Sequence, residues 1–104
     1  NPKQLDQLGA LYQPTSMLTI EGNQVVGASN IVAKYKALGG NLQFQPESLD
    51  VQMGTTNSAL IAVVTGKLRI DNENQLHYFQ VFQLVSTGPG AYYVHNDLLR
   101  LIYS

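Results

Sequence analysis

The sequence predicts an α+β fold in which short helices come first and a sheet curls around them. Helical spacing of apolar residues is confined to segments 3–12 and 28–38, and the remainder has the pattern of strands separated by turns. The connections between the long strands are short, so consecutive strands should pair antiparallel. At 104 residues the chain has room for one modest core, and we expect a single domain over 1–104.

Two local elements are expected in the first part of the chain. Leu5, Leu8 and Leu11 recur at roughly helical spacing and Pro14 stops the pattern, which predicts a short helix over residues 3–12. Next come two short apolar runs, 16–19 and 24–26. Gly and Asn supply turn geometry between them, at 20–23, which predicts a small hairpin.

A second helix is predicted over residues 28–38. Ile31, Tyr35 and Leu38 share one helical face, and the Gly-Gly-Asn sequence at 39–41 is a strong stop signal. After it, apolar and polar residues alternate from 42 to 52, the period of a half-buried strand.

Three long strands are predicted over residues 58–70, 76–85 and 91–103. The middle one carries apolar side chains on both of its faces, so both faces of the sheet should be covered. The predicted helices are too few and too short to cover both. We therefore expect one face of the sheet to meet a second subunit.

Composition excludes several classes of function. Six Lys and Arg against seven Asp and Glu give a net charge of -1, which lacks the cationic surface that nucleic acids require. The chain has no Cys, so disulfides and Cys-based zinc sites are excluded. No apolar run is long enough to span a membrane, and we expect no membrane insertion and no cofactor.

Residues suited to catalysis or metal binding are few. The only imidazoles are His77 and His95, and two His on different predicted strands do not make a metal site. His95, Asn96 and Asp97 could do acid and base chemistry in a cavity. The alternative is that these three satisfy local hydrogen bonds, or that Asp97 forms a salt bridge with a cation such as Arg100.

Acidic residues gather in two predicted turns. Glu21 lies at the tip of the first hairpin, while Asp71 and Glu73 share the turn between two long strands. Asp and Asn are favoured wherever a chain reverses, so these turns have an ordinary explanation as well.

Several segments together resemble the nuclear transport factor 2 family. They are Leu-Gly-Ala-Leu-Tyr at 8–12 before Ser-Met-Leu-Thr at 16–19, the helix from Gly27 to Leu38, the strand at 80–84, and the stretch 92–101 with Tyr-Val-His-Asn-Asp before Arg-Leu. Together they cover nearly the whole chain. The resemblance implies a cone-shaped fold, with a strongly bent antiparallel sheet and an apolar pocket.

The resemblance also implies a non-enzymatic function. Family members that carry GDP-bound Ran into the nucleus work as homodimers and pass the pore by contacting FG nucleoporins, which implies a location in cytoplasm, nucleus and nuclear pore. An aromatic side chain of Ran enters the pocket, and carboxylates on its rim pair with basic residues of Ran. The matching rim positions are Glu21, Asp71 and Glu73. Three converging acids would speed encounter with a basic partner and make binding sensitive to salt.

The pocket positions implied by the resemblance are all aliphatic in this chain: Ile20, Leu38, Leu42, Leu98 and Leu99. They could equally be ordinary core residues. The family commonly has Trp in place of Ile20 and Phe in place of Leu99, so a wider and less aromatic pocket is expected. The long first helix of the family is mostly absent.

Two other functions remain open. One is a related adaptor domain of an mRNA-export or stress-granule protein, which would pair with a different subunit or belong to a longer chain. The other is a pocket enzyme of the isomerase or dehydratase type, which would need His95 or Asp97 to face the cavity.

Overall fold

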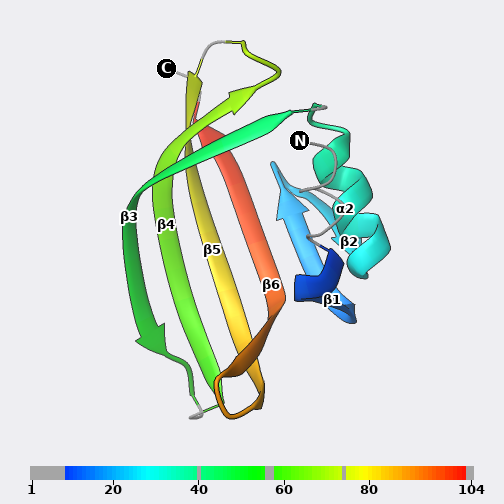
Figure 1. The fold of residues 1–104 in the computed structure, drawn as a ribbon, viewed down its shortest axis with the longest axis vertical. Coiled ribbons are helices and arrows are strands. Elements are labelled where there is room, and N and C mark those ends of the chain that lie inside the picture. Colours follow the sequence, from blue (N-terminus) through cyan, green and yellow to red (C-terminus); the bar gives the residue numbers. More distant parts are fainter. Residues whose placement is uncertain (1–8, 40, 56–57, 74, 103–104) are drawn as a thin grey trace.

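The structure is a computed structural model that describes residues 9–39, 41–55, 58–73 and 75–102. It contains the 3₁₀ helix η1 (Gly9–Leu11), the helix α2 (Ala28–Lys36) and six strands joined in one sheet. The strands are β1 (Tyr12–Ile20), β2 (Asn23–Val26), β3 (Leu42–Met53), β4 (Ala59–Ile70), β5 (Gln75–Gly88) and β6 (Ala91–Ile102). Their order across the sheet is β2-β1-β6-β5-β4-β3. Figure 1 shows the four long strands curving side by side, with α2 next to the β1–β2 hairpin.

The predicted first helix is wrong at its C-terminal end. Residues 3–8 of that prediction lie outside the described residues, Gly9–Leu11 form a single 3₁₀ turn, and Tyr12 already belongs to β1. Pro14, expected to stop a helix, lies inside this strand. Pairing with β6 is interrupted between Tyr12 and Met17, so the missing N–H of Pro14 falls in an irregular stretch that tolerates it.

The β1–β2 hairpin is confirmed. Ile20 pairs with Asn23, so only Glu21 and Gly22 form the turn, and their φ angles are 51° and 84°. Two positive φ angles define the type I′ turn, whose twist matches that of the flanking strands. The backbone of Glu21 therefore has a left-handed conformation, in the turn between β1 and β2.

Helix α2 confirms the second predicted helix, although it ends two residues earlier than expected. Ile31 and Tyr35 are its buried residues, and both belong to the core cluster between the helix and the sheet. The N–H groups of Leu38 and Gly39 bond to carbonyls three residues back, so the last turn tightens before the chain enters β3. A Cβ on Gly39 would lie 2.6 Å from Oδ2 of Asp71 and 2.6 Å from Cγ2 of Ile70, so a larger residue there would require these two side chains to shift.

The predicted antiparallel order of the long strands is confirmed for β3, β4, β5 and β6. The β1–β6 pairing, by contrast, is parallel, and no sequence pattern predicted it. Gly66 lies where the register of β3 shifts, between Pro46 and Ser48; a Cβ there would lie 2.2 Å from the carbonyl oxygen of Gln45. Glycine thus permits close backbone contact at the irregularity.

The two faces of the sheet differ in how well they are covered. The helix-facing face carries the buried core, which includes Ile31, Tyr35, Leu68, Tyr78 and Leu99. Cross-strand partners share a face, so the pairs of Val81 with Val63 and Leu98 place these residues together on the opposite, outer face.

Apolar residues remain exposed on that outer face, among them Ile61, Phe79 and Leu98. Strand β3 was predicted to be half-buried, and this is wrong for the isolated chain, because Leu42 is its only buried residue. The strand lies at the edge of the sheet, where Phe44 contacts the rings of Tyr35 and Tyr78 but the side chains after Leu42 remain exposed.

Candidate functional site

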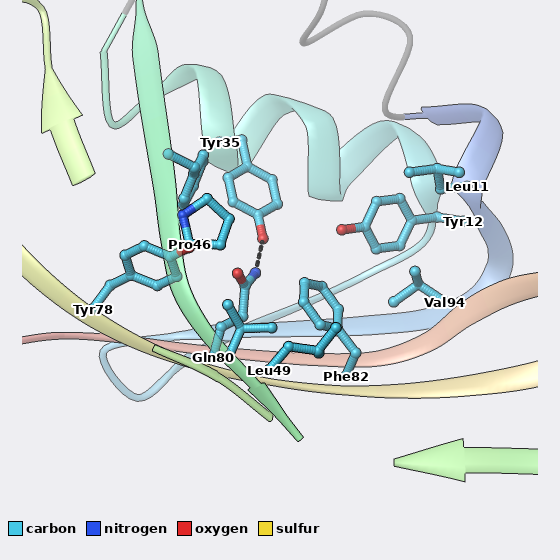
Figure 2. A pocket seen from close by; sticks show the side chains of 11 residues that line it. Leu11, Tyr12, Tyr35, Pro46, Leu49, Tyr78, Gln80, Phe82 and Val94 are labelled. Carbon is cyan, nitrogen blue, oxygen red and sulfur yellow. Dashed lines mark hydrogen bonds between the residues drawn. The ribbon is translucent and has the colours of Figure 1, made fainter. Parts of the chain in front are cut away.

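A cavity of about 360 Å³ lies between α2 and the helix-facing side of the sheet. Figure 2 shows the Tyr12 and Tyr35 rings on one side of it, with Gln80 and Phe82 of β5 on the other. Its lining is almost wholly apolar or aromatic and consists of Leu11, Tyr12, Tyr35, Phe44, Pro46, Leu49, Val64, Tyr78, Gln80, Phe82 and Val94.

Strand geometry brings these side chains together. Tyr78, Gln80 and Phe82 alternate along β5 and therefore point to the same face. Val64 is the cross-strand partner of Gln80, and Phe44 meets the Tyr78 ring edge to face with centroids 5.3 Å apart.

A buried polar network lies next to the cavity. Tyr12 and Tyr35 donate their hydroxyl protons to Oδ2 of Asp97, at 2.8 and 2.5 Å. The amide of Gln80 donates to Oδ1 of Asp97 at 2.8 Å and to the Tyr35 hydroxyl at 3.0 Å. Asp97 is only 1% exposed, so the three donors replace the water that a carboxylate would otherwise bind. The network ties together β1, α2, β5 and β6.

Burial dominates the ionisation of this network. It raises the pKa of Asp97, and the hydrogen bonds from Tyr35, Gln80 and Tyr12 partly offset that rise. Burial, followed by the charge of Asp97, raises the pKa values of Tyr12 and Tyr35 well above their ordinary range. Both phenols therefore stay protonated and act as donors.

The three predicted rim carboxylates differ in their partners. Glu21 accepts a hydrogen bond from the backbone N–H of Leu101, and its other oxygen lies 3.4 Å from Arg100. Oδ1 of Asp71 accepts from the backbone N–H of Asn41 at 2.7 Å. Glu73 is exposed. Figure 1 shows that the β1–β2 turn, the C-terminal end of α2 and the β4–β5 turn lie at the same end of the molecule.

The predicted pocket residues do not line the cavity described above. Ile20, Leu42 and Leu99 are buried in the core cluster, with Leu38 packed against it. Leu98 is 47% exposed on the outer face, where it borders a smaller groove with Phe79. Leu98 and Leu99 are separated because adjacent residues of a strand point to opposite faces.

The His95-Asn96-Asp97 trio is not brought together as an acid–base site. Asn96 donates to the side-chain oxygen of Gln83 at 2.6 Å, and the carboxylate of Asp97 is occupied by its three donors. His95 lies at the irregularity in β5–β6 pairing and meets Tyr93 edge to face, while its buried Nδ1 has no hydrogen-bond partner among the described residues.

The hydrogen bonds of Asn96 and Asp97 and the ion pair of Arg100 agree only in part with what the sequence predicts. Asn96 and Asp97 are hydrogen-bonded, as expected, but the bonds of Asp97 are not local, because Tyr12 and Tyr35 lie 85 and 62 residues away in the chain. Arg100 pairs with Glu21 and not with Asp97. Across the part of the chain that the structure describes, no group of three or more His, Cys, Asp or Glu residues could hold a metal ion. None of the described helices is long and apolar enough to cross a membrane.

Comparison with known proteins decides the family. The sequence profile described as the nuclear transport factor 2 (NTF2) domain matches residues 1–101. The chain belongs to the nuclear transport factor 2 family. A protein named nuclear transport factor 2 from Debaryomyces hansenii is 45% identical over 100 residues, which cover 94% of this chain and 80% of that protein. Its namesake from Saccharomyces cerevisiae is 43% identical over 100 residues, covering 94% and 79%.

Solved structures of the nuclear transport factor 2 fold confirm the predicted α+β architecture. Nuclear transport factor 2 from Cryptosporidium parvum superposes with a TM-score of 0.80 at 38% identity, covering 97% of this chain and 91% of that one. A ketosteroid isomerase-like protein from Erwinia carotovora shares the fold alone, with a TM-score of 0.68 at 14% identity over 96% and 82%. The named relatives support a non-enzymatic role in nuclear transport.

Sequence reasoning missed the network of Tyr12, Tyr35 and Gln80 around Asp97. The available signal was a Gln between aromatic residues on the inward face of β5, because a buried polar side chain requires partners. Nothing in the sequence indicated which tyrosines would supply them.

Proposed function

We propose that this protein is a nuclear transport factor that binds GDP-bound Ran and carries it through nuclear pores by contacting FG nucleoporins. The observation that carries the proposal is the 45% identity to a protein named nuclear transport factor 2 across 94% of the chain. On this proposal the protein moves between cytoplasm and nucleus.

The acidic rim formed by Glu21, Asp71 and Glu73 is the proposed contact for basic residues of Ran. The two turns that carry these residues lie at one end of the molecule, which supports a shared role. Glu21 and Asp71 are already held by backbone N–H groups and are fixed in orientation before a partner arrives. Arg100 partly neutralises Glu21, so Asp71 and Glu73 are expected to contribute more than Glu21 to long-range attraction.

The proposed pocket for an aromatic side chain of Ran is formed by Ile20, Leu38, Leu42 and Leu99. Leu98, which the resemblance also assigns to the pocket, lies on the outer face and is proposed below as part of the dimer contact. Three of these side chains are buried, and Leu38, after the end of α2, is only partly so. An entering ring would therefore displace Leu38 first. Burying an aromatic ring there would stabilise the complex by roughly 2–3 kcal/mol.

Calorimetric titration tests the Ran proposal. The protein is titrated with Ran loaded with GDP and, separately, with a GTP analogue, at low and at high salt. Binding that is selective for GDP and weakened by salt is expected. The variant Glu73→Lys should bind less tightly, while Glu47→Lys, on β3, serves as a charge-matched control. Unchanged affinity after reversal of all three rim charges would rule out the acidic-rim mechanism.

We also propose that the outer face of the sheet forms a homodimer. Ile61, Phe79 and Leu98 are 40%, 41% and 47% exposed there, and α2 lies on the opposite side. A contiguous apolar face of this kind is uncommon on a monomer and fits an isologous contact. Native mass measurement tests it: a monomer that also fails to bind Ran in either nucleotide state would favour the adaptor-domain alternative.

A further inference from the structure

The cavity beside α2 has no role in the proposed function. None of the proposed rim or pocket residues lines it. Five of its eleven lining residues are aromatic, namely Tyr12, Tyr35, Phe44, Tyr78 and Phe82. Its volume of about 360 Å³ falls in the range of cavities that hold small organic molecules.

Three of the polar side chains that line the cavity, Tyr12, Tyr35 and Gln80, have fixed hydrogen-bonding roles. The hydroxyls of Tyr12 and Tyr35 are committed as donors to Asp97, and Asp97 does not itself line the cavity. Gln80 is 6% exposed and uses its amide nitrogen twice, towards Asp97 and Tyr35. Its Oε1 accepts no hydrogen bond from any described residue. The cavity wall therefore offers an unused acceptor.

An unused acceptor selects a ligand with a matching donor. A ketone or an ether brings only acceptors and would leave Gln80 unpaired on desolvation, which costs binding free energy. A hydroxyl attached to an apolar ring would donate to Oε1 while its ring lay against the aromatic walls. The edge-to-face contacts that Phe44 makes with Tyr35 and Tyr78 show the ring arrangement that such a ligand would extend.

We propose that this cavity is a binding site for a small apolar ring compound carrying one hydroxyl, which donates its proton to Oε1 of Gln80. The volume suits one or two fused rings. The site is independent of the Ran proposal, because its residues and its ligand chemistry are different.

Titration of the whole chain with naphthol, monitored by NMR and calorimetry, tests the site. Methoxynaphthalene has the same rings but no donor, so it is expected to bind about tenfold more weakly, the equivalent of one net hydrogen bond. Amide shifts should concentrate on β5 and α2. Equal affinities for the two compounds, or no naphthol binding at all, would overturn the proposal.

Two variants locate the binding. Val64→Phe places a ring in the cavity next to Gln80 and should abolish naphthol binding. Val26→Phe adds the same ring on β2, where Val26 is 47% exposed, and should leave binding unchanged. If Val64→Phe folds and still binds naphthol as tightly as the wild type, the ligand lies elsewhere and the assignment is wrong. Gln80→Met, which removes the acceptor, should equalise the affinities for naphthol and methoxynaphthalene.

Discussion

Replacing Tyr35 by Phe removes one hydroxyl from the buried network and leaves the aromatic ring in place. That hydroxyl donates to Asp97 at 2.5 Å and accepts from the Gln80 amide at 3.0 Å. Tyr35 is 3% exposed, so water cannot easily replace the lost oxygen. The substitution therefore isolates the polar contribution of one group from the packing of α2 on the sheet.

The magnitude follows from the partners of the hydroxyl. A hydrogen bond to a charged group contributes about 1.5–3 kcal/mol, and a neutral one about 1 kcal/mol. Gln80 keeps its bond to Asp97, so little is lost on that side. We expect Tyr35→Phe to lower the free energy of unfolding by about 2–3 kcal/mol at neutral pH. Tyr12→Phe, which loses a single bond of 2.8 Å, should cost about 1.5–2 kcal/mol.

Urea denaturation followed by circular dichroism measures these changes. Tyr92→Phe is the matched control, because Tyr92 is 44% exposed and its substitution should change stability by less than about 0.5 kcal/mol. An unchanged slope of unfolding free energy against urea would show that the variants unfold from the same compact state.

A double-mutant cycle with Asp97→Asn decides whether the carboxylate is responsible. If Tyr35 acts through the charge of Asp97, Tyr35→Phe should cost at least about 1 kcal/mol less when Asp97→Asn is already present than it does in the wild type. Equal costs in the two backgrounds would refute the reasoning. So would a loss below about 0.5 kcal/mol for Tyr35→Phe alone.

Three further predictions concern acid stability, the β4–β5 turn and assembly. Burial raises the pKa of Asp97. The stability contributed by the protonated Asp97 side chain is therefore fully present below pH 3.8, the ordinary pKa of the group, and is lost as the pH rises through the raised pKa. Urea midpoints across acidic pH should show this trend, and Asp97→Asn should flatten it. Gly39→Ala, whose Cβ would lie 2.6 Å from side-chain atoms of Asp71 and Ile70, forces both side chains to shift and should cost about 1 kcal/mol in urea denaturation. Gly88→Ala, with open space around it, should cost less than about 0.5 kcal/mol. Leu98→Glu should convert a dimer to a monomer by native mass measurement, and an unchanged dimer would place the interface elsewhere.

Much of the element order could be predicted because turn chemistry and side-chain period act locally. The positive φ angles at Glu21, Gly22 and Asp71 fall in turns that the sequence marked. Helix α2 was predictable from its apolar face and its Gly stop signal. The helix predicted over residues 3–12 was wrong at its C-terminal end because a short apolar run is compatible with both a helix and a strand. Pairing with β6 places Tyr12 in a strand.

The candidate sites were less predictable. The acidic residues could be named from resemblance, but their partners could not, since the contact between Glu21 and Arg100 joins residues far apart in the chain. The burial of β3 was mispredicted because alternation shows which side chains share a face and not whether anything packs against that face.

The sequence by itself determined the family, the order and type of most elements and the absence of cysteine chemistry, since each depends on residue identity or on spacing within a short segment. Only the tertiary structure decided the parallel β1–β6 pairing, the separation of Leu98 from the core and the cavity beside α2. It also decided that Asp97 would be bonded by Tyr12, 85 residues away in the chain, and by Tyr35, 62 residues away. Contacts of that range depend on how the sheet brings strands together, and no local pattern encodes them.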